Sequence, residues 1–141
     1  MLMIRKIDKE DQVTFLDFCK KANVIESLDS PEIFWGIFNS HQLQGYVKID
    51  LQSLSVPLIQ DLQTMDHLES SIIEGLLRGA FHYCYSKQND IIAINDLSWL
   101  KAHLTEALEI LEKESNNNSG SYLLDLNKFF NKPCKGSSPC Q

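Results

Sequence analysis

The residues with the clearest chemical potential lie where a short predicted strand meets a long predicted helix, between Val56 and Lys87. Asp66 is suited to cap the first turn of this helix, and Glu69 follows three residues later as in a capping box. The first amides of a helix have no partners within it, so they attract phosphate or carboxylate. The sequence therefore predicts an anion site at this helix end, provided that the end is open. The apolar residues of the helix recur mostly at three- and four-residue steps and share one buried face: Leu68, Ile72, Leu76, Leu77, Ala80, Phe81 and Cys84.

A second candidate is the thiol pair Cys134 and Cys140, in a C-terminal segment without apolar periodicity. Paired thiols can bind metal, form a regulatory disulfide or hold a partner. Two cysteines do not complete a tetrahedral zinc site, so metal would need further ligands. A tail without a role is the alternative interpretation. The other cysteines, Cys19 and Cys84, fall on apolar helix faces and are interpreted as core residues.

Small residues follow one face of the long helix at four-residue steps, at Ser71, Gly75 and Gly79. Such a stripe can let a ligand approach the helix, or it can allow tight packing against a neighbouring element. We favour packing.

The histidines do not form a metal-binding pattern. His67 and His82 are too far apart for a zinc-binding helical pair. His103 and Glu106 lie one turn apart, but no third ligand is in view, so a surface pair is expected. The sequence therefore predicts no metal site.

Length and charge limit the class of protein. A chain of 141 residues fits one domain, which we place at residues 1–131 and follow by a flexible cysteine-containing tail at residues 132–141. The net charge of −6 disfavours nucleic acid and anionic membranes as partners. No apolar run is long enough to cross a bilayer and the first residues lack a signal peptide's apolar block, so a cytoplasmic protein is expected. A homodimer remains open.

Periodicity predicts the element order β-α-β-β-β-α-β-α-β, and therefore a mixed sheet with helices on both faces. Residues 43 to 51 alternate so regularly that a strand with one buried side is expected. The expected strands cover Met1–Ile7, Ile33–Phe38, Leu43–Leu51, Val56–Met65, Asp90–Asn95 and Tyr122–Leu126, and the expected helices run from Asp8 to Ala22, from Asp66 to Lys87, and from Leu97 to about Glu114.

This order, over nearly the entire chain, resembles the GNAT superfamily of N-acetyltransferases. QLQGYVKI resembles the family's third strand, VPLIQDLQTM with the helix after it resembles the fourth strand and the cofactor-binding helix, and DIIAIND resembles the fifth strand. The resemblance implies an α/β (α+β) fold with a mixed, mostly antiparallel sheet and helices on both faces. It also implies transfer of an acyl group from acetyl-CoA or another acyl-CoA to a small-molecule or peptide amine.

The resemblance also implies positions for the cofactor. The family's signature, Gln/Arg-x-x-Gly-x-Gly/Ala, falls on residues 68–73, where Ser71 replaces the first glycine and Ile73 the second. By this match, the amides of Ser70, Ser71 and Ile72 would meet the pyrophosphate. The backbone of Leu62, Gln63 and Thr64 would pair with pantetheine, where the fourth strand parts from the fifth.

For catalysis, the resemblance implies an acidic general base on the fourth strand. Asp61 is the acid on that strand and therefore the candidate, with a solvated carboxylate as the alternative interpretation. Leu111 occupies the position of the family's general-acid tyrosine, and leucine cannot donate a proton. Two functions follow as expectations: a GNAT-like acyltransferase, or a catalytically inactive GNAT-fold binding or regulatory module.

Overall fold

The computed structural model describes residues 1–52, 54–113 and 121–131, so the predicted tail with Cys134 and Cys140 lies outside the described residues. The strands are β1 (Leu2–Lys6), β2 (Ile33–Asn39), β3 (Gln42–Asp50), β4 (Leu58–Thr64), β5 (Ile91–Ile94), β6 (Glu112–Lys113) and β7 (Tyr122–Asp125). The helices are a short 3₁₀ turn (Lys9–Asp11), α1 (Gln12–Ala22), α2 (Ser70–Ser86), α3 (Ser98–His103), α4 (Thr105–Leu108) and α5 (Leu126–Asn131).

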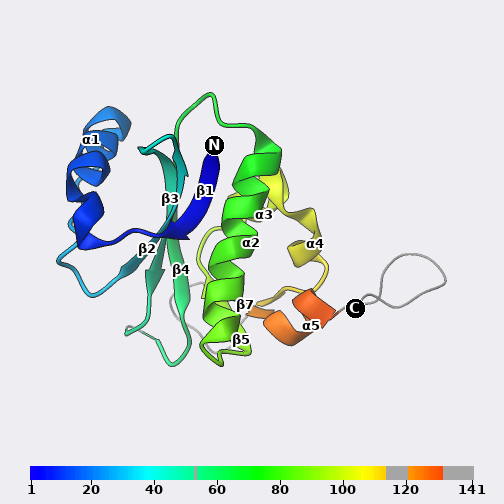
Figure 1. Cartoon of the computed structure of the whole chain (residues 1–141). Helices are drawn as coiled ribbons and strands as arrows, with labels where there is room; N and C mark the ends of the chain where they lie inside the picture. Colours follow the sequence, from blue (N-terminus) through cyan, green and yellow to red (C-terminus); the bar gives the residue numbers. More distant parts are fainter. Residues whose placement is uncertain (53, 114–120, 132–141) are drawn as a thin grey trace.

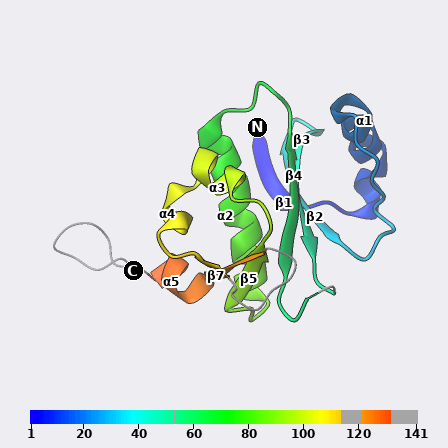
Figure 2. The same ribbon diagram turned by 180° about the vertical axis from the view of Figure 1, so that it is seen from behind.

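The strands form one seven-stranded sheet in the order β1-β2-β3-β4-β5-β7-β6. All neighbouring pairs are antiparallel except β4 and β5, which run parallel. The long helix α2 covers one face and α1 the other, as Figures 1 and 2 show from opposite sides. The predicted fold class, a mixed and mostly antiparallel sheet with helices on both faces, is therefore confirmed.

Each face of the sheet has its own apolar core, and β3 contributes to both. Val47 lies in the core under α2 and Tyr46 in the core under α1, and neither side chain is exposed to solvent. The expectation that β3 has one buried side was wrong, because Phe15 and Phe18 of α1 cover the side that carries Tyr46.

The C-terminal third differs most from the sequence-based expectation. The single helix expected after residue 97 is broken at Leu104, whose φ of −149° is not helical, and it becomes α3 and α4. The chain then adds β6, and after β7 it forms α5, which was not predicted. Leu126 and Phe129 of α5 are buried in the core under α2, so tertiary packing accounts for this last helix.

The small-residue stripe of α2 serves packing at Gly79. A Cβ at this position would lie 2.7 Å from Trp35 Nε1 and 3.2 Å from Ile4 Cγ2, whereas at Gly75 it would lie 3.6 Å from Ile4 Cδ1, an ordinary contact. Trp35 cannot move away freely because its ring packs on Tyr83, with ring centroids 5.0 Å apart. The predicted packing role is confirmed at Gly79.

These two glycines form a matched pair for a stability measurement. We expect Gly79→Ala to destabilise the protein by about 1–2 kcal/mol, because overpacking exceeds the gain in helix propensity. We expect Gly75→Ala to stabilise it by about 0.5–1 kcal/mol, because only the gain remains. Urea unfolding of both variants measures the two changes. Equal effects would show that the contact with Trp35 imposes no constraint.

Candidate functional site

The sheet opens between its two parallel strands. β4 and β5 pair only at Leu58 with Ala93 and at Ile59 with Ile94, although β4 continues to Thr64. One further contact, from Asn95 Nδ2 to the Gln60 carbonyl at 3.3 Å, closes the base of the opening. Beyond it the strands separate, and the backbone of β4 borders the gap.

A β-bulge at Gln60 determines which groups of β4 face this gap. Ile59 pairs with Ile49 and Asp61 pairs with Lys48, so Gln60 is the extra residue. The Met65 N–H donates to the Gln44 carbonyl, so residues 61, 63 and 65 direct their backbone groups toward β3. By alternation, Leu62 and Thr64 direct theirs toward the gap. Of the three residues predicted to meet pantetheine, Gln63 therefore pairs with β3 through its backbone.

The carboxylate of Asp61 is held against its own strand. Oδ1 accepts the Leu62 N–H at 2.9 Å, and Oδ2 accepts a hydrogen bond from Gln63 Nε2 at 3.1 Å. Two backbone N–H groups of β4 face the gap, those of Leu62 and Thr64. The Asp61 carboxylate already accepts the first, so the Thr64 N–H is the one that remains for a ligand.

The helix α2 begins above the open end of the gap, at Ser70 (Figure 1). The prediction that Asp66 caps it was wrong, because Met65 still belongs to the sheet through Gln44 and the chain needs one turn before the helix starts. Glu69 is the N-cap residue and makes no side-chain capping hydrogen bond. Ser70 and Ser71 are exposed, and within the part of the chain that the structure describes their amides meet no acceptor. The Ile72 N–H donates to the Glu69 carbonyl at 3.0 Å.

The apolar residues of the signature segment do not close this helix end. Ile73, at the position of the family's second glycine, is 5% exposed and belongs to the core under α2. Leu68 packs against the same core. Both side chains therefore point into the protein, and the first amides of α2 stay accessible.

Sequence reasoning missed one contact at this helix end. Ser70 Oγ and His103 Nδ1 are 2.8 Å apart, so the last residue of α3 lies beside the first residue of α2. The surface pair expected between His103 and Glu106 was wrong, because Glu106 instead forms an ion pair with Arg78 at 2.9 Å. No local pattern could have shown this, since residues 70 and 103 are far apart in sequence and meet only in the folded chain.

On the α1 side of the sheet, Asp61 neighbours a partly buried cluster of charges. Lys48, paired with Asp61 across the strands, contacts Glu26 at 3.0 Å and Glu32 at 3.6 Å. Burial lowers the pKa of Lys48, but the hydrogen bond and charge of Glu26, with Glu32 beside it, raise that pKa above its ordinary value. The lysine therefore stays charged and neutralises part of the cluster.

Tyr46 lies beside this cluster with its hydroxyl fully buried and, among the described residues, without a hydrogen-bond partner. Burial raises the pKa of Tyr46 strongly, and the carboxylates of Glu26 and Asp61 raise it further. The hydroxyl therefore stays protonated and has no role as a base.

Other predicted candidates contribute little to this site. Cys19 and Cys84 are buried, as expected, and burial raises the pKa of Cys84 to about 12, which makes its thiol unreactive. Among residues 1–52, 54–113 and 121–131, no three His, Cys, Asp or Glu side chains are arranged to hold a metal ion. Within the same ranges, no helix is long and apolar enough to span a membrane.

Comparison with protein families gave a match to a model described as "Proteasome activator complex subunit 4-like, HEAT repeat-like" over residues 10–130. By this sequence match the chain belongs to the family so described. HEAT repeats are stacked helix pairs of about 40–47 residues, whereas the matched segment contains strands β2 to β7 of a single sheet. The helical repeat of the description is therefore not the fold of this chain, and we take the fold from the structure.

Solved structures agree with the sheet. An acetyltransferase of the GNAT family from Staphylococcus aureus superimposes with a TM-score of 0.62 at 13% identity, covering 89% of this chain and 99% of that chain. A GNAT-family acetyltransferase from Streptococcus pneumoniae gives 0.60 at 13% identity, with coverages of 88% and 97%. The PaiA N-acetyltransferase from Thermoplasma acidophilum, solved in complex with coenzyme A, gives 0.60 at 14% identity, with coverages of 89% and 98%.

No curated protein matched by sequence. The superpositions on these solved structures show that the chain has the GNAT fold, so the resemblance inferred from the sequence is confirmed at the level of fold.

Proposed function

We propose that the protein is a GNAT-like acyltransferase that transfers an acyl group from acetyl-CoA or another acyl-CoA to an amine. The observation that carries this proposal is the short pairing of β4 with β5, which ends at Ile59 and Ile94 and leaves a gap beside an exposed helix N-terminus. A pantetheine arm can add to the free backbone of β4, and its pyrophosphate can meet the helix amides. The Staphylococcus, Streptococcus and Thermoplasma structures named above share the overall fold of this chain.

The residues present fit coenzyme A in part. By the alternation of the ladder Thr64 directs its backbone N–H into the gap, where no described residue accepts it, and Ser70 and Ser71 are exposed at the helix end. Glu69 opposes them with its negative charge, and His103 lies next to Ser70 as a hydrogen-bonding partner for an anion. Together these groups bind and orient a thioester, which supplies the activated acyl group. Asp61 would take the proton from the attacking amine as the new C–N bond forms, and the thioester C–S bond would break to release CoA as a thiolate, which solvent can protonate.

A specific observation also favours the second candidate, a GNAT-fold binding or regulatory module without catalysis. The Asp61 carboxylate already accepts hydrogen bonds from two groups of its own strand, and Leu111 stands at the position of the family's general acid. The acyl-CoA site would then serve recognition alone.

Calorimetric titration with acetyl-CoA and with free CoA tests the donor site. We expect saturable binding with a Kd of roughly micromolar magnitude, and Ser71→Glu should raise this Kd about tenfold or more, because it adds a carboxylate beside the phosphates. Ser86→Glu, a change of the same kind at the opposite end of α2, is the control and should leave the Kd unchanged. Absence of heat and of a thermal shift with either ligand would contradict the proposal.

Thiol release from acetyl-CoA with a panel of amines separates the two candidates. An enzyme should lose most of its turnover in Asp61→Asn while it keeps the Kd for CoA. Binding without turnover of any amine would instead support the module.

A further inference from the structure

The first strand presents an unpaired edge. β1 is the outermost strand of the sheet, and in the part of the chain that the structure describes its outer side meets no other strand. The Ile7 N–H donates to the Phe34 carbonyl, and the Ser40 N–H donates to the Met1 carbonyl. Because an antiparallel ladder alternates, Leu2, Ile4 and Lys6 direct their N–H and C=O groups away from β2.

This edge is also unusually apolar. Met1 is 94% exposed, Leu2 47%, Met3 51% and Ile4 37%. Natural proteins usually protect an edge strand with proline, a bulge, a covering segment or several charges. β1 pairs with β2 in an unbroken register, and in β1 only Arg5 and Lys6 are charged. An edge of this kind favours pairing with another strand.

We propose that two copies of this chain form a homodimer by antiparallel pairing of β1 with β1 around a two-fold axis at Ile4. In this register Ile4 faces the partner's Ile4, and Leu2 faces the partner's Lys6. Each of these facing pairs exchanges two hydrogen bonds, because these residues carry the outward backbone groups. The two seven-stranded sheets then join into one continuous sheet.

The distribution of charge favours a second copy as the occupant of this edge. The register places Lys6 opposite Leu2, so no like charges face each other directly. The second cation of the strand, Arg5, forms a bidentate ion pair with Asp11 at 2.7 and 2.9 Å and projects toward α1. The same strand can therefore serve as both partners without a charge conflict.

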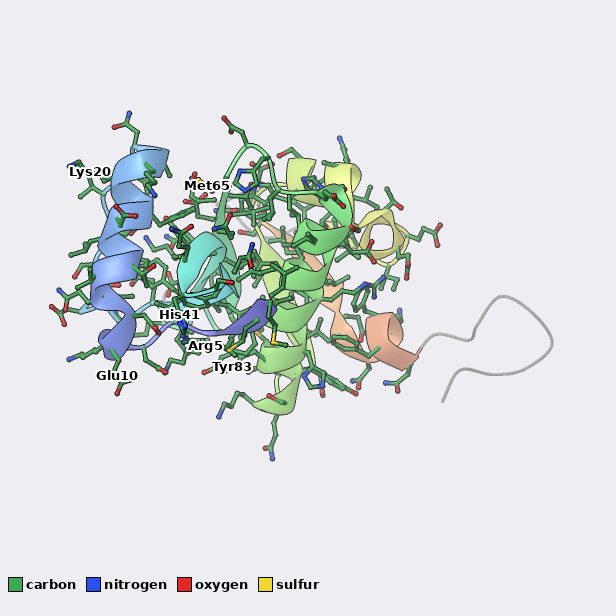
Figure 3. The ribbon with its side chains drawn as sticks, turned by 45° about the horizontal axis from the view of Figure 1, so that its top comes forward. Arg5, Glu10, Lys20, His41, Met65 and Tyr83 are labelled. Atoms are coloured by element: carbon green, nitrogen blue, oxygen red, sulfur yellow. The ribbon has the colours of Figure 1, made fainter. Side chains whose placement is uncertain are left out.

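The surface beside the strand enlarges the contact. A stable dimer buries about 800 Å² on each partner, which five edge residues alone do not supply. A groove of about 420 Å³ adjoins β1 on its α1 side, lined by Met1, Met3, Arg5, Phe38, Ser40 and His41. Figure 3 shows Arg5 and His41 on this side of the strand. Two-fold pairing brings Met3 and Arg5 of the partner to the rim of this groove.

Sedimentation of the full chain from roughly 1 µM to 1 mM tests the dimer, since this range covers the dissociation constants of weak protein–protein interfaces. Leu2→Lys places a lysine opposite the partner's Lys6 twice in each dimer, and we expect the dimer Kd to rise about tenfold or more. Adding Lys6→Glu to Leu2→Lys should restore association. Leu2→Glu alone should tighten it.

Ile25→Lys is the matched control, because Ile25 is a fully exposed apolar residue away from β1. It should leave the Kd unchanged. A monomer at every concentration would overturn the proposal, as would a dimer indifferent to both Leu2→Lys and the double variant. A monomer that takes up an unrelated extended peptide along β1 would also overturn it. The edge lies three strands from β4, so these results are independent of the donor titration.

Discussion

Phe81→Ala is expected to lower the free energy of unfolding by about 4 kcal/mol, the largest effect that we predict for a single substitution. Phe81 has no solvent exposure, and its ring meets Phe129 edge to face with centroids 5.7 Å apart. The truncation leaves a cavity between α2 and α5 and removes the ring contact with Phe129. Urea unfolding followed by circular dichroism measures the change.

Phe130→Ala is the control for this prediction. Phe130 lies on α5, next to Phe129, but it is only partly buried, against Tyr85 and His82. It should cost less than half as much as Phe81→Ala, because less apolar area is lost from the core. Similar losses in the two variants would contradict the prediction, because they would indicate that the contact of Phe81 with Phe129 contributes no more than the partly buried contacts of Phe130.

Lys48→Met is expected to destabilise the protein by about 3 kcal/mol, because it leaves the Glu26 and Glu32 carboxylates without their shared cation. The three side chains are between 15% and 20% exposed, so solvent compensates only partly. The free energy of unfolding in urea at neutral pH measures this loss.

Two variants keep the interpretation of Lys48→Met specific. Adding Glu26→Gln and Glu32→Gln removes the unpaired charges and should recover most of the lost stability. Lys21→Met breaks an exposed ion pair with Asp17 and should cost less than about 0.5 kcal/mol. A loss below about 1 kcal/mol for Lys48→Met would show that water screens the cluster effectively.

Periodicity predicted the positions of the elements as far as β5. The apolar face of α2 and the strands β1 to β5 were predicted within a few residues, because their spacing reflects burial directly. The leucines after residue 97 fit one straight helix equally well, yet the chain forms two short helices there. Leu100 of α3, Leu104 at the break and Ala107 of α4 are all buried. Spacing alone does not reveal such a break, since it depends on the shape of the core beneath.

The candidate site was predictable only in its backbone. The resemblance to the GNAT family implied a helix end above the parting of β4 and β5, and the structure has this arrangement. The cap at Asp66 failed because a local capping pattern takes no account of the sheet bond between Met65 and Gln44. The contact of Ser70 with His103 and the burial of Tyr46 depend on residues distant in sequence, so no local pattern carried them.

The extra residue in β4 decides on which side of the sheet a carboxylate emerges. Ile59 faces α2, and in a regular strand Asp61 would face α2 as well. Insertion of Gln60 inverts the alternation, so Asp61 lies on the opposite side, as the register partner of Lys48, and Leu62 packs against the apolar core. One inserted residue thus gives a single strand apolar contacts toward one layer of helices and an acidic group toward the other. A molecule that approaches from the α1 layer would therefore meet the carboxylate of Asp61. A molecule held beside α2 would lie on the other face of the same strand.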